Sequence, residues 1–170
     1  MKISILLPYK ENFSLNYAGA VSLFVNDITN ASIYKNSTKV FGNTVHRKYL
    51  SKNYINLITN KKFFLSTNKQ YVENFLNYET KRKSDLIEVH NRPSYINLIK
   101  KKYNNNIFLY FHNDPLSMNG SKSTIERINL LTNVDKIIFN SNWCRERFFI
   151  DLDNKNQLLK KTSICFQSSS

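Results

Sequence analysis

Glycine, proline and cysteine are all scarce in this sequence of 170 residues. Only three glycines and three prolines occur, which argues against an all-β fold built on many tight turns. The two cysteines, Cys144 and Cys165, lack the spacing of a zinc site and predict two reduced thiols. No apolar run approaches the roughly 20 residues of a membrane span, and the first apolar segment is too short for a secretion signal. We therefore expect a soluble, cytoplasmic protein.

Acidic side chains are also few: the sequence has 12 Asp and Glu against 25 Lys and Arg, which gives a net charge of +13. Such an excess suits nucleic acid, an anionic membrane surface or phosphorylated ligands. Codon bias in an AT-rich genome is an alternative source of this charge, and the lysines would then lie on solvated faces with no partner. The sequence is also rich in Asn, Ile, Tyr and Phe, as that bias would produce. The cations are spread along the chain, and no helix-turn-helix, zinc-finger or RRM motif is present. The charge therefore favours an anionic partner without naming one.

Short apolar segments alternate with segments of helical periodicity along residues 1–170. This alternation predicts one α/β, Rossmann-like domain with a mostly parallel sheet and helices on both faces. The expected strands are Lys2–Pro8, Thr38–Phe41, Tyr54–Thr59, Lys62–Leu65, Asp85–Val89, Ile107–Phe111, Asp135–Phe139 and Thr162–Phe166. The expected helices lie near Ala18–Asn30, from a Thr67–Gln70 capping box to Lys81–Lys83, near Ser94–Lys102, over Thr124–Thr132, and from Ser141 through Ile150.

Some single residues of these elements also carry expectations. In the helix over Thr124–Thr132, we expect Ile125, Ile128 and Leu131 to share one side. Trp143, like the two phenylalanines that follow it in its helix, is expected in the core. Asp114 precedes a proline, and this pair is typical of turns, so a turn role is favoured over a catalytic one.

Polar residues follow four of the predicted strands where each strand ends. The carboxyl ends of parallel strands meet at one edge of an open sheet, and ligands bind in the crevice outside them. Two of the three histidines, His90 and His112, take equivalent positions after consecutive strands. A single such histidine is usually a structural hydrogen-bonding residue, but two together favour a functional site. The four polar groups are Tyr9-Lys10-Glu11, His90-Asn91-Arg92, His112-Asn113-Asp114 and Asn140-Ser141-Asn142.

Small residues, Ala18-Gly19-Ala20, precede the first predicted helix. They would let backbone N–H groups approach an anion at the start of that helix, although a lone glycine there is more often only a turn. The G-x-G-x-x-G fingerprint and the lysine of a phosphate-binding loop are absent, which argues against NTPase chemistry. No G-x-S-x-G, no H-E-x-x-H and no cluster of metal ligands occurs, so we expect no metal.

Four segments, in order, carry a resemblance to a known family. They are Ile3–Ile28, Asp85–Tyr95, Ile107–Pro115 and Val134–Phe148. In order and spacing they resemble the N-terminal domain of the family-four retaining glycosyltransferases, which have the two-domain GT-B architecture. The resemblance extends over essentially the whole chain. It implies one half of a GT-B fold, the half that binds the acceptor in a sugar-nucleotide-dependent, retaining hexosyl transfer.

The resemblance also implies roles for single residues. His112 would be the catalytic residue that faces the reacting centre. Gly19 and Ala20 would lie near the diphosphate or sugar of the donor, although family members often have two glycines here. The acceptor side of the cleft would be lined by Lys10, His90, Asn91, Arg92, Asn113 and Ser141.

In the family, a second Rossmann domain with a pair of spaced glutamates holds most of the nucleotide. We therefore expect the donor-binding domain to be absent and residues 1–170 to be inactive alone. The expected partners are a nucleotide-sugar donor, a glycan or lipid-linked acceptor of envelope polysaccharide or lipopolysaccharide synthesis, and peripherally the anionic inner face of the membrane. No cofactor and no nucleic acid are expected. A non-catalytic doubly wound binding module and a basic nucleic-acid-binding domain stay open as alternatives.

Overall fold

One sheet of seven parallel strands runs through the computed structural model, which describes residues 1–58, 66–153 and 158–167. The strand order is β3-β2-β1-β4-β5-β6-β7, so the chain builds one half of the sheet outward from β1 and then the other half outward from β4. This is the doubly wound arrangement, in which the strand order reverses between β1 and β4. The strands are β1 (Ile3–Leu6), β2 (Thr38–Gly42), β3 (Tyr54–Asn56), β4 (Leu86–His90), β5 (Asn106–Phe111), β6 (Lys136–Phe139) and β7 (Thr162–Ile164).

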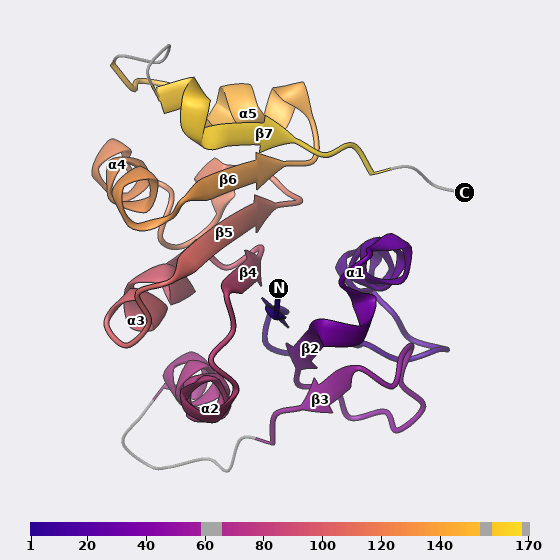
Figure 1. Cartoon of the computed structure of the whole chain (residues 1–170). Coiled ribbons are helices and arrows are strands. Elements are labelled where there is room, and N and C mark those ends of the chain that lie inside the picture. Colours follow the sequence, from indigo (N-terminus) through magenta and orange to yellow (C-terminus); the bar gives the residue numbers. More distant parts are fainter. Residues whose placement is uncertain (59–65, 154–157, 168–170) are drawn as a thin grey trace.

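Helices cover both faces of the sheet, as predicted, but unequally (Figure 1). The connection from β1 to β2 places α1 on one face, and the later connections place α2, α3, α4 and α5 on the other. Right-handed crossovers explain this division, because winding in the opposite direction from β1 and from β4 puts the helices on opposite faces. The helices are α1 (Ala20–Ala31), α2 (Thr67–Arg82), α3 (Ile96–Lys100), α4 (Thr124–Asn133) and α5 (Asn142–Phe148).

Alternate residues of the strands divide between two hydrophobic clusters. In β4, Ile87 and Val89 belong to the larger cluster under α2, α3, α4 and α5, whereas Leu86 belongs to the cluster under α1. In β5, Leu109 joins the larger cluster and Phe108 packs toward α1. Because strand side chains alternate between faces, the remaining residues of β4 and β5 that point toward α1 form a stripe of polar side chains. That stripe holds the candidate site.

Most of the predicted helix and strand boundaries lie within a few residues of those in the structure, but one helix cap differs. The Thr67–Gln70 capping box is wrong, because α2 is capped by Ser66, whose side chain accepts a hydrogen bond from the Lys69 N–H at 3.3 Å. The basic segment ends α2 as expected, because Arg82 is its last residue and Lys83 is its C-cap, which adopts the left-handed conformation. The expected strand Lys62–Leu65 lies outside the described residues.

Two expectations about apolar side chains on the helices are wrong. Trp143, expected in the core, is 58% exposed. Ile125 and Ile128, expected to share one side of α4 with Leu131, are 78% and 52% exposed, whereas Leu131 is 3% exposed. The side of α4 that faces the sheet instead buries Arg127 with its neighbouring leucines. The Arg127 guanidinium is held there by the carbonyl oxygens of Lys122 and Ile150, at 2.8 and 2.6 Å, so its burial is compensated by hydrogen bonds. Among the described residues, none of the helices combines the length and the apolar composition that crossing a bilayer requires.

Candidate functional site

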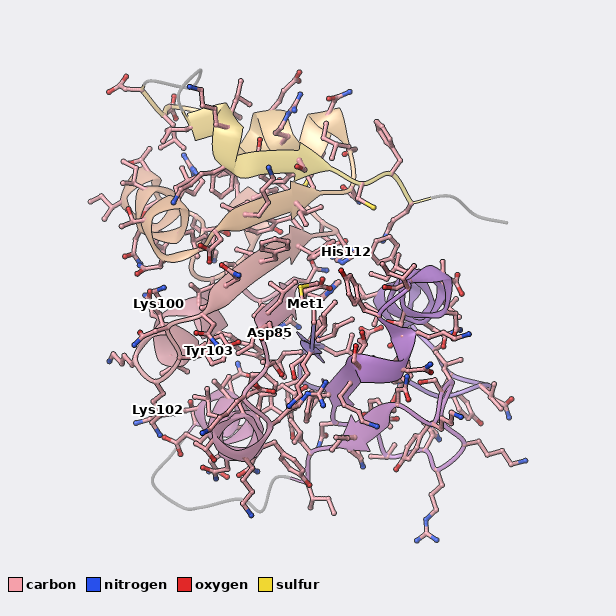
Figure 2. All side chains as sticks on the ribbon, viewed as in Figure 1. Met1, Asp85, Lys100, Lys102, Tyr103 and His112 are labelled. Atoms are coloured by element: carbon pink, nitrogen blue, oxygen red, sulfur yellow. The ribbon has the colours of Figure 1, made fainter. Side chains whose placement is uncertain are left out.

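The carboxyl ends of β1, β4 and β5 lie side by side and bring the predicted site residues to one edge. In the register of the sheet, Leu6 of β1 is opposite Val89 of β4, and His90 is opposite Tyr110 of β5. The end of β4 and the residue after β5 are therefore neighbours. Figure 2 shows His112 at the end of β5 beside α1, with Lys100 and Lys102 at the opposite end of the sheet. His90 and His112 share this edge, and Gly19 begins the helix whose Phe24 packs against His112.

The two histidines contact each other directly. Nδ1 of His90 and Nε2 of His112 are 2.9 Å apart, and the two rings are nearly parallel, at 20°. Tyr110 stacks on His90 with ring centroids 4.4 Å apart, and Phe24 of α1 packs edge-on against His112 at 5.1 Å. His90 is 0% exposed and His112 is 8% exposed. His90 therefore lies beneath His112, and it does not line an open cleft as expected.

The second ring nitrogen of His112 points toward the segment that follows β7. Its Nδ1 is 2.6 Å from the side-chain amide nitrogen of Gln167, which is an exposed residue. Nε2 is turned inward to His90. Nδ1 is thus the His112 atom that a ligand at this edge would meet, in the place that the Gln167 amide now takes.

Burial keeps both imidazoles neutral at physiological pH. It lowers the pKa of His90 to about 3, and burial together with the neighbouring His90 lowers the pKa of His112 to about 3. Beneath them lies Glu88, whose pKa burial raises to about 7. Its Oε2 is 3.8 Å from Nε2 of His90. Because His90 is neutral, this contact joins a carboxyl group to an imidazole and is not an ion pair.

Asn91 and Arg92 hold the backbone that carries His112. Asn91 adopts a positive φ of 53°, is 4% exposed, and accepts a hydrogen bond on Oδ1 from the His112 N–H at 2.8 Å. The Arg92 guanidinium donates to the Asn91 carbonyl at 2.7 Å. On the other side, the amide of Asn140 donates to the His112 carbonyl at 2.7 Å. Asn91 and Asn140 thus fix the position of His112 through its backbone.

The turn before α1 already contains a carboxylate. Gly19 is the N-cap of α1, and Oε1 of Glu11 accepts a hydrogen bond from the N–H of Ser22, in the first turn of the helix, at 3.2 Å. A Cβ atom at Gly19 would collide with this carboxylate oxygen. Gly19 and the exposed Ala20 therefore lie where the sequence placed them, but the chain supplies its own anion to the helix N-terminus.

A small cavity of about 160 Å³ lies next to this turn. It is lined in part by Tyr17 and His46, whose rings stack at 4.0 Å. Arg47 and Lys48 supply positive charge to the same cavity, and Ser14 also lines it. Part of the excess positive charge thus lies close to the α1 end of the site.

The other predicted residues lie around the same edge in supporting roles. Lys10 is exposed and has a positive φ of 70°, with Nζ 6.0 Å from the centre of the Tyr9 ring. Ser141 caps α5, because its Oγ accepts a hydrogen bond from the Cys144 N–H at 3.1 Å. The carbonyl of the exposed Asn113 accepts from the Cys144 thiol at 3.2 Å. Ser141 thus caps α5, and the carbonyl of Asn113 attaches α5 to the segment after β5.

Asp114 has the turn role that the sequence favoured. Its Oδ1 accepts a hydrogen bond from the Leu116 N–H at 3.0 Å, and its carboxylate forms an ion pair with Arg147 of α5 at 2.9 Å. The Arg147 hydrogen bond also lowers the pKa of Asp114. Asp114 is therefore ionised and committed to structure, and it leaves His112 as the titratable group of this segment at the edge.

Sequence reasoning missed Glu88, Tyr110, Phe24 and Gln167. Glu88 had a readable signal, because it is a charged residue inside the apolar run LIEV and stands two positions before His90. Residues two apart in a strand share a face. No such signal existed for Gln167, which is 55 residues from His112 in the chain.

The histidine pair at the centre of this edge offers neutral hydrogen-bonding groups. In the described parts of the chain, no group of three or more His, Cys, Asp or Glu residues is placed to hold a metal ion. A neutral imidazole such as His112 can accept a hydrogen bond or a proton on one nitrogen and donate on the other. Such a group suits the recognition of hydroxyl groups.

No protein-family model matches the sequence, and no curated protein is similar to it. Solved structures are similar in fold. Sucrose-phosphate synthase from Thermosynechococcus elongatus superposes with a TM-score of 0.65 at 14% identity, over 99% of this chain and 49% of that one. Anabaena HepE in complex with UDP-glucose gives 0.63 at 13% identity, over 98% and 44%. A UDP-N-acetylglucosamine 2-epimerase gives 0.53 at 8% identity, over 96% and 47%.

These similarities establish the architecture. The chain spans about half the length of the synthase, HepE and the epimerase. Identities of 8 to 14% carry the fold and not the activity. The seven-stranded parallel sheet with helices on both faces is thus a single Rossmann-like domain that corresponds to one half of a GT-B fold.

Proposed function

We propose that this chain is the acceptor-side domain of a retaining glycosyltransferase of family four, which transfers a hexosyl group from a nucleotide sugar. The observation that carries the proposal is the position of His112 at the carboxyl edge of half a GT-B fold, beside α1. Ligands of doubly wound sheets bind at this edge, where the strand order reverses. HepE has the same fold and binds UDP-glucose, which supports a nucleotide sugar as donor.

In this proposal His112 acts as a neutral hydrogen-bond acceptor. Its low pKa leaves the imidazole unprotonated, so Nδ1 is able to accept a hydrogen bond from a hydroxyl group of the sugar or the acceptor once Gln167 moves aside. The N–H groups at the start of α1 would face the sugar-nucleotide donor once Glu11 no longer accepts the hydrogen bond from the Ser22 N–H. Lys10, Arg92, Asn113 and Ser141 would border the acceptor. Neither a metal nor a cofactor is part of this mechanism.

The remaining expectations enter the proposal as its wider setting. A second Rossmann-like domain would hold the nucleotide, since positioning of donor and acceptor together is what lowers the barrier. The acceptor would be a growing glycan or a lipid-linked sugar of the cell envelope. A net charge of +13 supports peripheral contact of a cytoplasmic enzyme with the anionic inner face of a membrane.

Nuclear magnetic resonance titration tests the site without requiring turnover. UDP-glucose, GDP-mannose and methyl α-glucoside are added separately to the ¹⁵N-labelled chain. The proposal expects shifts at Gly19, His112 and Ser141, which are lost for methyl glucoside in His112→Gln and kept in the matched control His46→Gln. Shifts confined to the amino edge around Lys100 and Lys102, or no shifts with any of the three compounds, contradict it.

A second experiment tests the activity itself. A separately expressed donor-binding domain of a GT-B transferase is added to the chain, and UDP released from UDP-glucose is measured. Release above that of either part alone, falling about 100-fold or more in His112→Gln, supports a catalytic role. Equal release by His112→Gln and by the unsubstituted chain would place His112 outside the chemistry.

A further inference from the structure

The histidine pair can hold its two protons in either of two arrangements. Because one hydrogen bond joins Nδ1 of His90 to Nε2 of His112, exactly one of those two atoms carries the shared hydrogen when both rings are neutral. In the first arrangement His112 donates from Nε2, and its Nδ1 is bare. In the second His90 donates from Nδ1, and Nδ1 of His112 carries a hydrogen. The two arrangements present opposite chemistry at the edge, an acceptor or a donor.

Glu88 acts on the inner end of this pair. In the first arrangement Nε2 of His90 carries the hydrogen, and in the second it is a bare lone pair. This nitrogen is fully buried and has no hydrogen-bond partner among the described residues, and the nearest charged oxygen is Oε2 of Glu88 at 3.8 Å. A carboxylate attracts an N–H and repels a lone pair, and the low local dielectric strengthens both effects. Ionised Glu88 therefore favours the first arrangement.

The contact that His112 makes at its outer nitrogen, Nδ1, favours the same arrangement. The side-chain group of Gln167 that faces Nδ1 of His112 is the amide nitrogen, at 2.6 Å, and an amide nitrogen can only donate. This requires a bare Nδ1, as in the first arrangement. An amide can rotate to offer its oxygen instead, so Gln167 alone would tolerate either arrangement. Once it is ionised, Glu88 has no such alternative, because a carboxylate only accepts.

We propose that Glu88 is a positioning residue that, through His90, fixes His112 in the tautomer with a bare Nδ1 toward the edge of the sheet. His112 would then meet a ligand as a hydrogen-bond acceptor, which selects a hydroxyl or other N–H or O–H donor and rejects a group that only accepts. Glu88 itself is 8% exposed, so it would act on a ligand through the histidines and not by direct contact. That His112 binds a sugar rests on the proposed function, but the tautomer of the histidine pair does not.

Long-range ¹H–¹⁵N spectra of the imidazole rings read the tautomer directly. They are recorded on the full chain at pH 8, where Glu88 is ionised, and the three histidines are assigned by single substitution. We expect hydrogen on Nε2 and none on Nδ1 for both His90 and His112. Glu88→Leu removes the acceptor and leaves an apolar side chain that can pack in the interior. The ratio of the tautomer with a bare Nδ1 to the other tautomer at His112 is expected to fall about tenfold, because one charge–dipole contact is lost where the local dielectric is low.

Two further variants separate positioning from packing. Glu88→Gln keeps the size of the side chain but offers an amide, which can accept from or donate to His90, so the tautomer ratio is expected to stay lowered as in Glu88→Leu. Glu146→Gln removes an exposed carboxylate of α5 and is expected to leave the ratio unchanged. A hydrogen on Nδ1 of His112 in the unsubstituted chain overturns the proposal, and so does an unchanged ratio in Glu88→Leu. If the tautomer responds as expected but no sugar shifts His112, the positioning role stands and the proposed function fails.

Discussion

The carboxylate of Glu11 accepts a hydrogen bond from the backbone N–H of Ser22 at 3.2 Å, in the first turn of α1. The first N–H groups of a helix lack partners within the helix, and negative charge there is favourable. Gly19, the N-cap, has no side chain that could serve instead. Its missing Cβ leaves the space in which the Glu11 carboxylate lies. Glu11 thus does for α1 what Ser123 and Ser141 do for α4 and α5.

Gly19→Ala is therefore expected to cost more in the natural background than in a background without Glu11. Gly19 has a φ of −76°, which alanine adopts without strain, so without Glu11 the gain from a less flexible unfolded chain and the poorer fit of alanine to an N-cap nearly cancel. In the natural background the new methyl group displaces Glu11, which costs about 1 kcal/mol. Urea unfolding of the two single variants and of the Glu11→Ala, Gly19→Ala double variant measures the coupling. Additive free energies would mean that Gly19 and Glu11 do not share this space.

The buried carboxyl of Glu88 predicts a pH-dependent effect of Glu88→Gln. Its pKa is about 7 in the folded chain against 4.5 as the ordinary value, so the carboxyl favours folding below pH 4.5 and loses that contribution as the pH rises through 7. At pH 8 the neutral amide should therefore stabilise the fold by up to about 3 kcal/mol, and at pH 4.5 by much less. Urea midpoints at the two pH values check this, with Glu146→Gln as the exposed control. An equal effect at both values would contradict the burial of an ionisable Glu88.

The regular elements were predictable because they depend on local pattern. Apolar runs such as Ile107–Phe111 became strands, and the polar residues that follow them met at one edge because parallel strands share a direction. Side-chain burial on helices was less predictable. Ile125 and Trp143 have suitable spacing, but whether a helix face is covered depends on which elements pack against it, and the spacing does not contain that information.

The side-chain contacts within the site could not be predicted from the sequence for a related reason. The contact between His90 and His112 depends on the register between β4 and β5, and the Gln167 contact depends on where β7 ends. Both are long-range relationships that a single sequence does not encode in its local pattern. The position of Glu88 next to His90 was within reach, because a charge two residues before a histidine in an apolar strand lies on the same face.

Neither His90 nor His112 is expected to titrate between pH 8 and pH 5 in the folded chain. Both have a pKa of about 3, whereas the unfolded chain binds their protons near 6.5. Their contribution to stability is thus complete above 6.5 and is lost as the pH falls toward 3, at about 1.4 kcal/mol per pH unit for each histidine. Imidazole proton shifts follow the two rings, and the backbone amides of α3 report whether the fold persists. A midpoint above pH 6 for His112 would show that burial does not control it.

Gln167→Ala should open His112 to reagents without unfolding the site. Gln167 is exposed, so its loss removes a hydrogen bond worth about 1 kcal/mol or less and little packing. Nδ1 of His112 then loses its only hydrogen-bond partner among the described residues and becomes accessible from the edge. Carbethoxylation by diethyl pyrocarbonate, which attacks a non-protonated imidazole nitrogen, should therefore become faster at His112. Peptide mass spectrometry resolves the modified residues.

The histidines and a neighbouring residue supply the controls for this measurement. The half-buried His46 should react at the same rate in both proteins, and the fully buried His90 should stay unreactive. Phe166→Ala, in the same segment, removes a side chain that is 69% exposed and should leave His112 protected. Equal protection in Gln167→Ala would mean that Phe24 and the strand ends shield Nδ1 by themselves. A ligand would then need a movement of α1, and displacement of Gln167 alone would not admit it.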